Sequence, residues 1–495
     1  MSTTDYKAIS IEKIALKGAT WLALFKIISQ SFSWVITIMI ARILLPSDYG
    51  LMAMAAILSG YASYLSELGI GSAIIQKEKV EQNELSAVFW FIMLFSILLS
   101  AVCFIGAYFM AYIFNEPRII PLTQTISAIF ILEGLQIVPL NLLKKELGFK
   151  KVGLIEMTGT VIASASMFLI AYYGGGVWTL VAGSFILSLT KLILIYSNVK
   201  WFPQLHFSLK DAKSYLKYGI NVTIGRSFFY LFESSDKFFA GRAWIPQMLG
   251  HYTFALGLAQ IPTEKIVVLI NQVSFPVLSK LQNDKEAFNK FYIKIVEITA
   301  TLAIPIFIGG YLIGEDIIKL LLNDKWYPII PVFKYLCLTQ IFTALNAINS
   351  FVHYSQGRPQ WSLYYHVVLA ISMATSFYIA VQYGLNAILI PWFTTYIIAC
   401  VVWIIITLKS IGINLITYLK ILSNSIVATF AIAVGIILSD YIIVSLLSQN
   451  IYLIFSLALK ITLSILIYIG YYWFFHRHLF YSLLNLRKAQ SIAAT

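Results

Sequence analysis

Long apolar stretches recur along nearly the whole chain and alternate with short polar connections. Each stretch holds roughly the 20 largely apolar residues that an α-helix needs to cross a bilayer. The pattern therefore predicts an all-α integral membrane protein with about fourteen transmembrane helices. The predicted spans are residues 19–43, 51–69, 86–112, 121–143, 153–173, 177–198, 218–241, 252–275, 289–313, 329–353, 361–382, 386–408, 418–440 and 451–474.

The polar and turn residues between these stretches repeat. The sequence ARILLPSDYG around Arg42 returns as GRAWIPQMLG around Arg242, so Arg, Pro and Gly recur at the same offsets 200 residues later. Further matches lie 210 residues apart, 119–121 with 329–331 and 173–174 with 383–384. We infer that a membrane bundle has been duplicated, as in many transporters.

An even number of predicted spans separates the two copies of this motif, so the helices that carry them run in the same direction. The sequence thus predicts two pseudo-symmetric six-helix lobes, residues 1–206 and 207–410, related by an axis along the membrane normal. Residues 411–495 add two transmembrane helices and a tail, and they have no counterpart in the repeat.

Composition agrees with this reading, since 59% of the residues are hydrophobic and only 12% are charged, against roughly 25% charged in soluble domains. The formal charge of +13 would suit a nucleic-acid partner, but the basic residues gather in alternate loops. That distribution follows the positive-inside rule, so we expect membrane lipid around the chain, no nucleic acid, a location in the cytoplasmic membrane and both termini in the cytoplasm. The basic loop residues are Lys144, Lys145, Lys150, Lys151, Lys200, Lys210, Lys213, Lys217, Lys280, Lys285, Lys290 and Lys294.

The three cysteines, Cys103, Cys337 and Cys400, all lie inside apolar stretches. They form no CxxC pair and have no histidine at metal-ligand spacing, so we expect ordinary membrane-core residues and no metal site. No cofactor is expected either, and coupling to an ion or a proton is left open.

Charged side chains at membrane depth are costly and mark a pathway or a buried pair. In the predicted span 218–241, Arg226, Tyr230, Glu233 and Lys237 share a stripe roughly 60° wide at 100° per residue. Glu233 and Lys237 could merely neutralise each other while Arg226 reaches the inner surface. We favour a functional stripe, because a second one lies 200 residues earlier.

That second stripe consists of Lys26, Gln30, Ser33 and Thr37. Two polar stripes with basic residues suit a cavity that binds an anionic cargo such as a pyrophosphate, because Lys and Arg bind phosphate oxygens strongly where water is sparse. The residues predicted to bind substrate are Lys26, Gln30, Arg226, Tyr230 and Lys237.

Two further pairs are assigned roles. Glu233 and Asp236 are the carboxylates preferred for ion or proton coupling, because they lie deepest in the span. Arg42 and Arg242 end their helices just before prolines and are assigned to an outer gate. The alternative for this arginine pair is interfacial anchoring beside a helix stop enforced by proline.

Several segments of the chain resemble the Wzx-type polysaccharide flippases of the colanic-acid exporter and teichuronic-acid branch, in the multidrug/oligosaccharidyl-lipid/polysaccharide superfamily. The resemblance rests on LKKELGFKKVGLIE (143–156), FPVLSKLQNDKE (275–286), NDKWYPIIPVFKYLC (323–337) and ELGIGSAIIQKE (67–78). It extends over most of the first 410 residues, and these motifs lie mainly at loops and helix ends.

The resemblance implies a MATE-like fold and alternating access between two lobes. The implied activity is export of undecaprenyl-diphosphate-linked oligosaccharide repeat units for exopolysaccharide, capsule or O-antigen synthesis. A polysaccharide polymerase and a chain-length regulator are the implied partners. The family performs no covalent chemistry, so no catalytic residue is assigned and the chain is not expected to be an enzyme.

Three alternatives remain open at this stage. A drug antiporter of the same superfamily would prefer acidic cavity residues, whereas these stripes are basic. A membrane polymerase or glycosyltransferase would need a sizeable outer loop, and the predicted outer loops are short. A scaffold without transport would have no use for deep charges on two matched helices.

Overall fold

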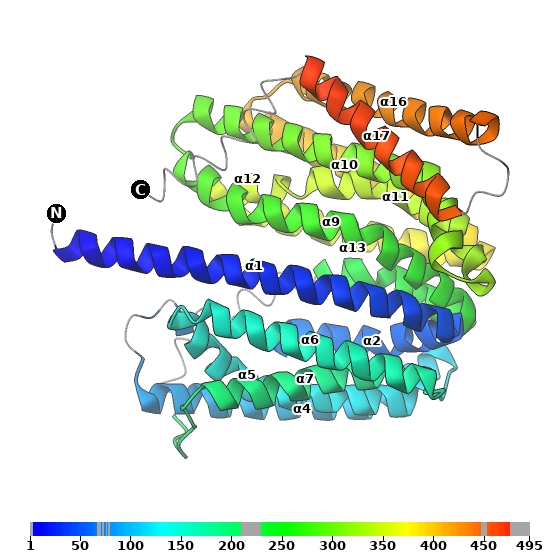
Figure 1. Ribbon diagram of the computed structural model, residues 1–495. Coiled ribbons are helices and arrows are strands. Elements are labelled where there is room, and N and C mark those ends of the chain that lie inside the picture. Colours follow the sequence, from blue (N-terminus) through cyan, green and yellow to red (C-terminus); the bar gives the residue numbers. More distant parts are fainter. Residues whose placement is uncertain are drawn as a thin grey trace. The chain divides into compact units, whose positions relative to one another are not determined.

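The computed structural model describes residues 3–66, 71, 74, 75, 77, 80–208, 229–446 and 453–475, and the regular elements among these residues are all helices (Figure 1). The chain divides into two compact units, Met1–Gly250 and His251–Thr495. Within the described residues, eleven helical segments are long and apolar enough to cross a membrane. The all-α membrane fold is confirmed, but the count of about fourteen is not. The predicted spans 51–69 and 252–275 fall on helices outside these eleven, and 218–241 begins outside the described residues.

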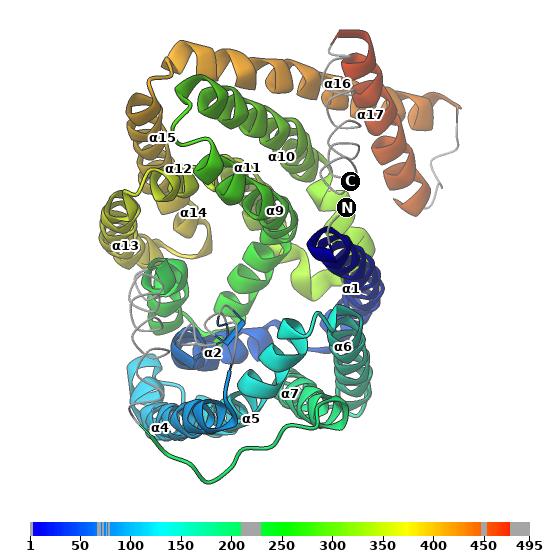
Figure 2. The ribbon, with the colours of Figure 1, turned by 90° about the vertical axis from the view of Figure 1, so that its left-hand side faces the viewer.

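Helices that run side by side build the first unit (Figures 1 and 2). Helix α1 packs along α6, α6 packs on α7, and α5 contacts α4, α7 and α2. Apolar side chains fill these contacts, as in the cluster of Leu85, Val88, Phe89, Ile92 and Val138 between α4 and α5. The helices are α1 (Thr3–Ile43), α2 (Pro46–Ser66), α4 (Gln82–Phe114), α5 (Ile119–Lys145), α6 (Phe149–Tyr172) and α7 (Trp178–Asn198).

Helix α9 (Pro246–Lys280) begins in the first unit and continues into the second. In the second unit α10 packs on α11 and α16, and α16 packs on α17. Its elements are α10 (Lys285–Leu321), η1 (Asp324–Ile329), α11 (Ile330–Asn346), α12 (Asn349–Ser355), α13 (Pro359–Ala380), η2 (Val381–Tyr383), η3 (Leu385–Ile388), α14 (Leu389–Pro391), η4 (Trp392–Tyr396), α15 (Ile397–Ile411), α16 (Leu415–Leu446) and α17 (Leu453–Phe475).

The repeat in the sequence is matched by a repeat in backbone geometry, at the turns before α6 and α13. Leu147, before α6, has a positive φ of 56°, and Gly357, before α13, has a φ of 69°. The next residue closes the same turn in both copies, since Gly148 donates its N–H to Leu143 O and Arg358 donates its N–H to His353 O, each at 2.9 Å. The turn between α5 and α6 therefore recurs 210 residues later between α12 and α13. The lobe boundary at 206/207 rests on the sequence repeat and stays a prediction.

The last helix, α17, is held to α10 by polar contacts as well as by packing. Lys460 on α17 pairs with Asp316 on α10, with Nζ and Oδ2 2.8 Å apart. The Tyr468 hydroxyl donates to Thr301 O at 2.7 Å. In a hydrocarbon environment such contacts orient a helix that apolar packing alone would leave free to rotate.

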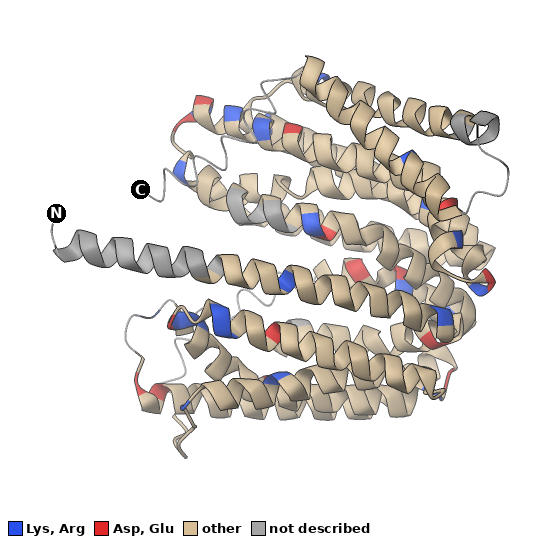
Figure 3. Cartoon of the chain, viewed as in Figure 1, with Lys and Arg blue, Asp and Glu red and all other residues tan. Residues whose placement is uncertain are grey.

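Charged residues are more frequent toward the ends of the helices, with a few along their middles (Figure 3). In the first unit Lys144 and Lys145 end α5, and Lys150 and Lys151 begin α6. The opposite end of α5 carries Arg118, paired with Glu116 at 2.7 Å. This distribution suits helices that span a bilayer, where a charge at the midplane is costly.

Candidate functional site

The duplicated Arg-Pro-Gly motif forms the same corner twice within the first unit. Each copy ends one helix and starts the next at proline, and the N–H of Leu44 or Trp244 donates to the carbonyl four residues earlier at 2.8 Å. The arginines predicted to gate the outer end, Arg42 and Arg242, are exposed at these corners. Their gating role stays a prediction.

The two corners pack against each other through their glycines. A Cβ atom placed on Gly50 would lie 1.8 Å from the carbonyl oxygen of Pro246, and one on Gly250 would lie 1.7 Å from that of Pro46. The contact is reciprocal, as expected when a two-fold pseudo-axis passes between α2 and the start of α9. Only glycine allows the two backbones to approach this closely.

The described part of the predicted polar span is a helix over residues 229–243, and it contacts α2 through Tyr230. The Tyr230 hydroxyl donates to the carbonyl oxygen of Ile57 at 2.6 Å, and its ring lies 5.7 Å from that of Tyr61. Tyr230 is 8% exposed. Tyr230, the first described residue of the stripe that it shares with Glu233 and Lys237, is therefore part of the contact between this helix and α2. Arg226 lies outside the described residues.

The predicted coupling carboxylates differ in their burial. Asp236 is 1% exposed, between the buried Ser235 and the half-buried Lys237, whose backbone N–H donates to Asp236 Oδ1 at 2.7 Å. Glu233 and Lys237 are half-buried. A carboxyl group held this deeply is costly unless hydrogen-bonded, so Asp236 has the environment expected of a functional or structural acid. Its role in coupling stays a prediction.

On α1 the earlier stripe lies beside the face that packs on α6. Lys26 and Thr37 are exposed, while Gln30 and Ser33 are half-buried. The packing face is carried by residues such as Ile40, which is buried against Ala171. At 100° per residue the two faces are about a quarter turn apart. The polar stripe is thus left outside the core of the first unit, but substrate binding by Lys26 and Gln30 stays a prediction.

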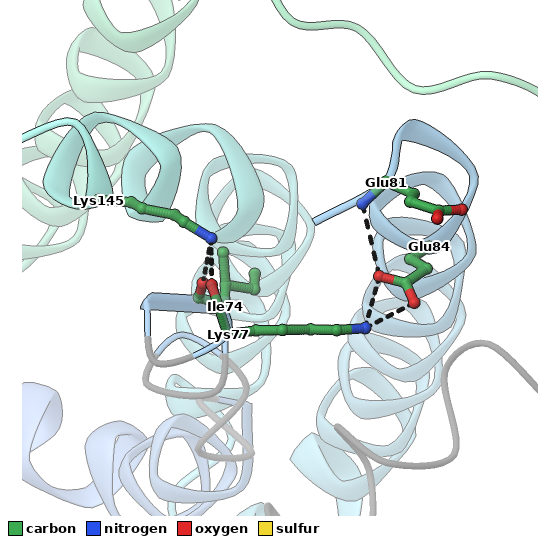
Figure 4. A network of polar contacts seen from close by, with 5 residues as sticks. All are labelled: Ile74, Lys77, Glu81, Glu84 and Lys145. Carbon is green, nitrogen blue, oxygen red and sulfur yellow. Dashed lines mark hydrogen bonds and ion pairs between the residues drawn. The ribbon is translucent and has the colours of Figure 1, made fainter. Parts of the chain in front are cut away.

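A polar network fixes the start of α4 to the end of α5 (Figure 4). Lys145 Nζ donates to the carbonyl oxygens of Ile74, at 3.3 Å, and of Lys77. Lys77 Nζ in turn contacts Glu84 Oε1 at 2.6 Å, and the Glu81 N–H donates to Glu84 Oε2. Lys145 belongs to the LKKELGF segment, so this segment has a structural task at the end of α5.

A row of polar residues that was not predicted from the sequence lies on one face of the span Asp324–Ser355. Asn346, Asn349 and His353 are spaced by three and four residues, so they share a helix face. That spacing could have been recognised in the sequence. Only the structure shows that polar residues from three other helices contact this face. Among the described residues, no group of three or more His, Cys, Asp or Glu side chains could hold a metal ion.

Comparison with known proteins decides the family. The model of the family described as "Polysaccharide biosynthesis protein" matches residues 39–331, which is more than half of the chain. The chain belongs to this family.

Two curated proteins are similar to this chain along most of its length. The lipopolysaccharide biosynthesis protein WzxC of Escherichia coli K12 is 26% identical over 347 residues, which cover 69% of this chain and 70% of WzxC. The teichuronic acid biosynthesis protein TuaB of Bacillus subtilis 168 is 22% identical over 385 residues, which cover 77% and 80%.

Solved structures show that this chain shares its fold with two transport proteins. The lipid II flippase MurJ in an inward closed conformation aligns with a TM-score of 0.69 and 15% identity, covering 92% of this chain and all of that one. An inward-facing multidrug resistance MATE transporter of the MOP superfamily aligns with a TM-score of 0.62 and 15% identity, covering 77% and 94%. The MATE-like fold predicted from the sequence is therefore confirmed.

Proposed function

We propose that this protein exports undecaprenyl-diphosphate-linked oligosaccharide repeat units across the cytoplasmic membrane for surface polysaccharide synthesis. The observation that carries the proposal is membership of the polysaccharide biosynthesis family over more than half of the chain. The names of the relatives support it, because WzxC and TuaB are polysaccharide biosynthesis proteins. The fold shared with a lipid II flippase is consistent with a cargo attached to a lipid carrier.

The physical task explains why a duplicated helical fold would be used. A diphosphate and several sugars must cross about 30 Å of hydrocarbon, and the barrier is prohibitive without a polar route. The polyprenyl tail can remain in the lipid while the polar head moves through the protein. In our proposal the head enters from the cytoplasmic side and leaves from the outer side, by alternating access.

Basic side chains on the two polar stripes would bind the diphosphate. Lys26 and Lys237 are the described members of this set, and Arg226 completes it. Ammonium and guanidinium groups at membrane depth interact more strongly with phosphate oxygens than they would in water. Glu233 and Asp236 would then couple transport to an ion or a proton, and Arg42 and Arg242 would act at the outer gate.

Location and partners follow from the same proposal. Under the positive-inside rule the basic residues at the α5–α6 connection would lie in the cytoplasm, and both termini would then be cytoplasmic. A polymerase and a chain-length regulator would receive the exported units, as the family resemblance implies. A drug antiporter or a membrane glycosyltransferase is less well supported, because the similar curated proteins are named for polysaccharide synthesis.

The decisive experiment is to delete the gene in its native host and to analyse the polyprenyl lipids of each membrane leaflet. The proposal predicts complete undecaprenyl-diphosphate oligosaccharide accumulating on the cytoplasmic leaflet, together with loss of surface polymer. Complete units that reach the outer leaflet but remain unpolymerised would instead indicate a polymerase. An unchanged lipid profile would favour the drug antiporter.

Complementation of that strain tests the cavity residues. Lys237→Ala should lower export while leaving membrane insertion intact, and Lys26→Ala combined with Arg226→Ala should differ from the sum of the single effects. Lys151→Ala is the matched control, because Lys151 is exposed at the start of α6 and outside both stripes. Normal polymer output from a stable Lys237→Ala variant would contradict the cavity assignment.

A further inference from the structure

The second unit buries polar side chains where the first unit buries aliphatic ones. Leu143, Val152 and Ile155 belong to one apolar cluster of the first unit. The residues 210 positions later are His353, Ser362 and Tyr365. Since the same local fold forms around aliphatic residues in the first copy, the fold itself does not require these polar groups. Polar groups at membrane depth are costly and point to a function.

Three hydrogen bonds in a chain join Tyr365 to polar residues of three other helices. The Tyr292 hydroxyl on α10 donates to Asn349 Oδ1 at 3.0 Å. Asn349 Nδ2 donates to Asn346 Oδ1 at 2.8 Å, and Asn346 Nδ2 donates to the Tyr365 hydroxyl on α13 at 2.8 Å. The chain crosses the interruption between α11 and α12, where the helix ends at Asn346 and resumes at Asn349.

His353 lies one turn beyond Asn349, inside an aromatic stack. Its ring centroid is 4.6 Å from that of Trp403 at an interplanar angle of 30°, and 6.2 Å from that of Trp361 at 17°. Trp403 also stacks on Tyr365, 4.6 Å away and almost parallel at 8°. His353 is 1% exposed. The imidazole is therefore enclosed by rings and removed from bulk water.

Hydrogen bonding defines which ring nitrogen of His353 carries the hydrogen. The Thr407 hydroxyl donates to Trp403 O at 2.9 Å, so its oxygen can only accept from the imidazole. His353 Nε2 lies 3.2 Å from Thr407 Oγ1 and must be the N–H donor of that bond. Nδ1 then carries a lone pair, and this buried atom has no hydrogen-bond partner among the described residues.

We propose that His353 is a proton-binding site of this protein and that the proton adds at Nδ1. Histidine is the side chain whose charge changes between pH 5 and 8. The added charge would lie near the Arg358 cation and between aromatic rings, and both oppose an imidazolium while the stack stays closed. Tyr292, Tyr365, His366 and Cys400 are titratable groups on neighbouring elements. A buried imidazolium favours a conformation that lets water reach the ring, so proton binding would loosen the stack and the hydrogen-bonded chain. The proposal concerns binding and holds whatever the cargo is.

Nitrogen NMR of the full chain in lipid nanodiscs, labelled with ¹⁵N-histidine, tests this directly. Of the six histidines, the His353 signal is assigned by its loss in His353→Leu, the residue of the first copy. When the pH is lowered from about 8 to beyond the acid end of the range of about 5 to 8 in which free histidine titrates, His353 should change from the Nε2–H tautomer to the doubly protonated ring, because the closed stack and Arg358 oppose the added charge. A His353 ring that stays neutral over this range would overturn the proposal.

Two further measurements keep the test valid if His353→Leu does not fold. Thr407→Val removes the acceptor of Nε2–H, so one histidine should lose its fixed tautomer, and this assigns the signal independently. His366 is the internal control, because its Nδ1 lies 2.7 Å from Ser362 O and must carry the hydrogen. The two histidines should therefore show opposite tautomers at high pH. The same tautomer for both would contradict the assignment of Nδ1 as the proton acceptor.

Discussion

Substitution of either corner glycine should separate the two copies of the motif. In Gly50→Ala the new methyl group would lie 1.8 Å from Pro246 O. Cβ atoms essentially never lie within 3.0 Å of another heavy atom in this way, so the clash exceeds 1 Å. The clashing atom belongs to the backbone of a proline, so no side chain can rotate away. The start of α9 must therefore move relative to α2, and the same argument applies to Gly250→Ala.

The size of the effect follows from two opposing contributions. Overpacking a close contact costs about 1–3 kcal/mol, with the upper end expected for a backbone clash. Alanine regains up to about 1 kcal/mol through its higher helix propensity. We expect a net destabilisation of about 2 kcal/mol for each variant. The double variant should lose less than twice that amount, because one displacement relieves both clashes.

Thermal unfolding of the purified protein in detergent measures this prediction. Gly257→Ala is the matched control, since Gly257 is exposed on α9 and a Cβ there meets no atom within 4 Å. This control should be as stable as the wild type or slightly more stable. Wild-type stability in Gly50→Ala, or simple additivity in the double variant, would refute the reciprocal contact.

Three further predictions concern single polar contacts. Tyr230→Phe removes the 2.6 Å hydrogen bond to α2 and should cost about 1 kcal/mol in thermal unfolding; an unchanged melting temperature would contradict it. Lys460→Ala and Asp316→Ala should each release α17 from α10, and a double-mutant cycle of unfolding free energies should show coupling between them, whereas additive effects would mean that the pair contributes nothing. The hydrogen bond from Arg118 holds the pKa of Glu116 below its usual value of 4.5. The stabilisation that this pair gives to the folded state is thus present above about pH 4.5 and is lost as the pH falls through the lower folded-state pKa of Glu116. In Arg118→Gln the free energy of unfolding should therefore fall less steeply as the pH is lowered over this range.

The long apolar stretches and the repeat could be predicted because both are local or additive properties of the sequence. A helix that crosses hydrocarbon must satisfy its backbone internally, so length and hydropathy indicate it without knowledge of its neighbours. Repeated Arg, Pro and Gly residues predicted the two corners at Pro46 and Pro246, because proline and glycine restrict backbone geometry directly. The motif segments likewise predicted the family, which the family match confirms.

Which side chains meet could not be predicted in the same way. In a soluble protein an apolar stripe marks the buried face, but in a membrane the lipid-facing and helix-facing residues are both apolar, so periodicity loses that information. The stripe of Tyr230, Glu233 and Lys237 was visible in the sequence, whereas the contact of Tyr230 with the backbone of Ile57 was not. The row of Asn346, Asn349 and His353 was equally visible, but its hydrogen bonds follow only from the positions of Tyr292, Tyr365 and Thr407.

The sequence by itself determined that this protein is a duplicated helical membrane protein and to which family it belongs. The tertiary structure decided that the two corner glycines pack closely, that Asp236 is buried and that Nδ1 of His353 has no hydrogen-bond partner within the described part of the chain. The physical reason is that hydropathy and backbone restriction act residue by residue, whereas hydrogen bonds and close approach between helices depend on partners that lie far apart in the sequence.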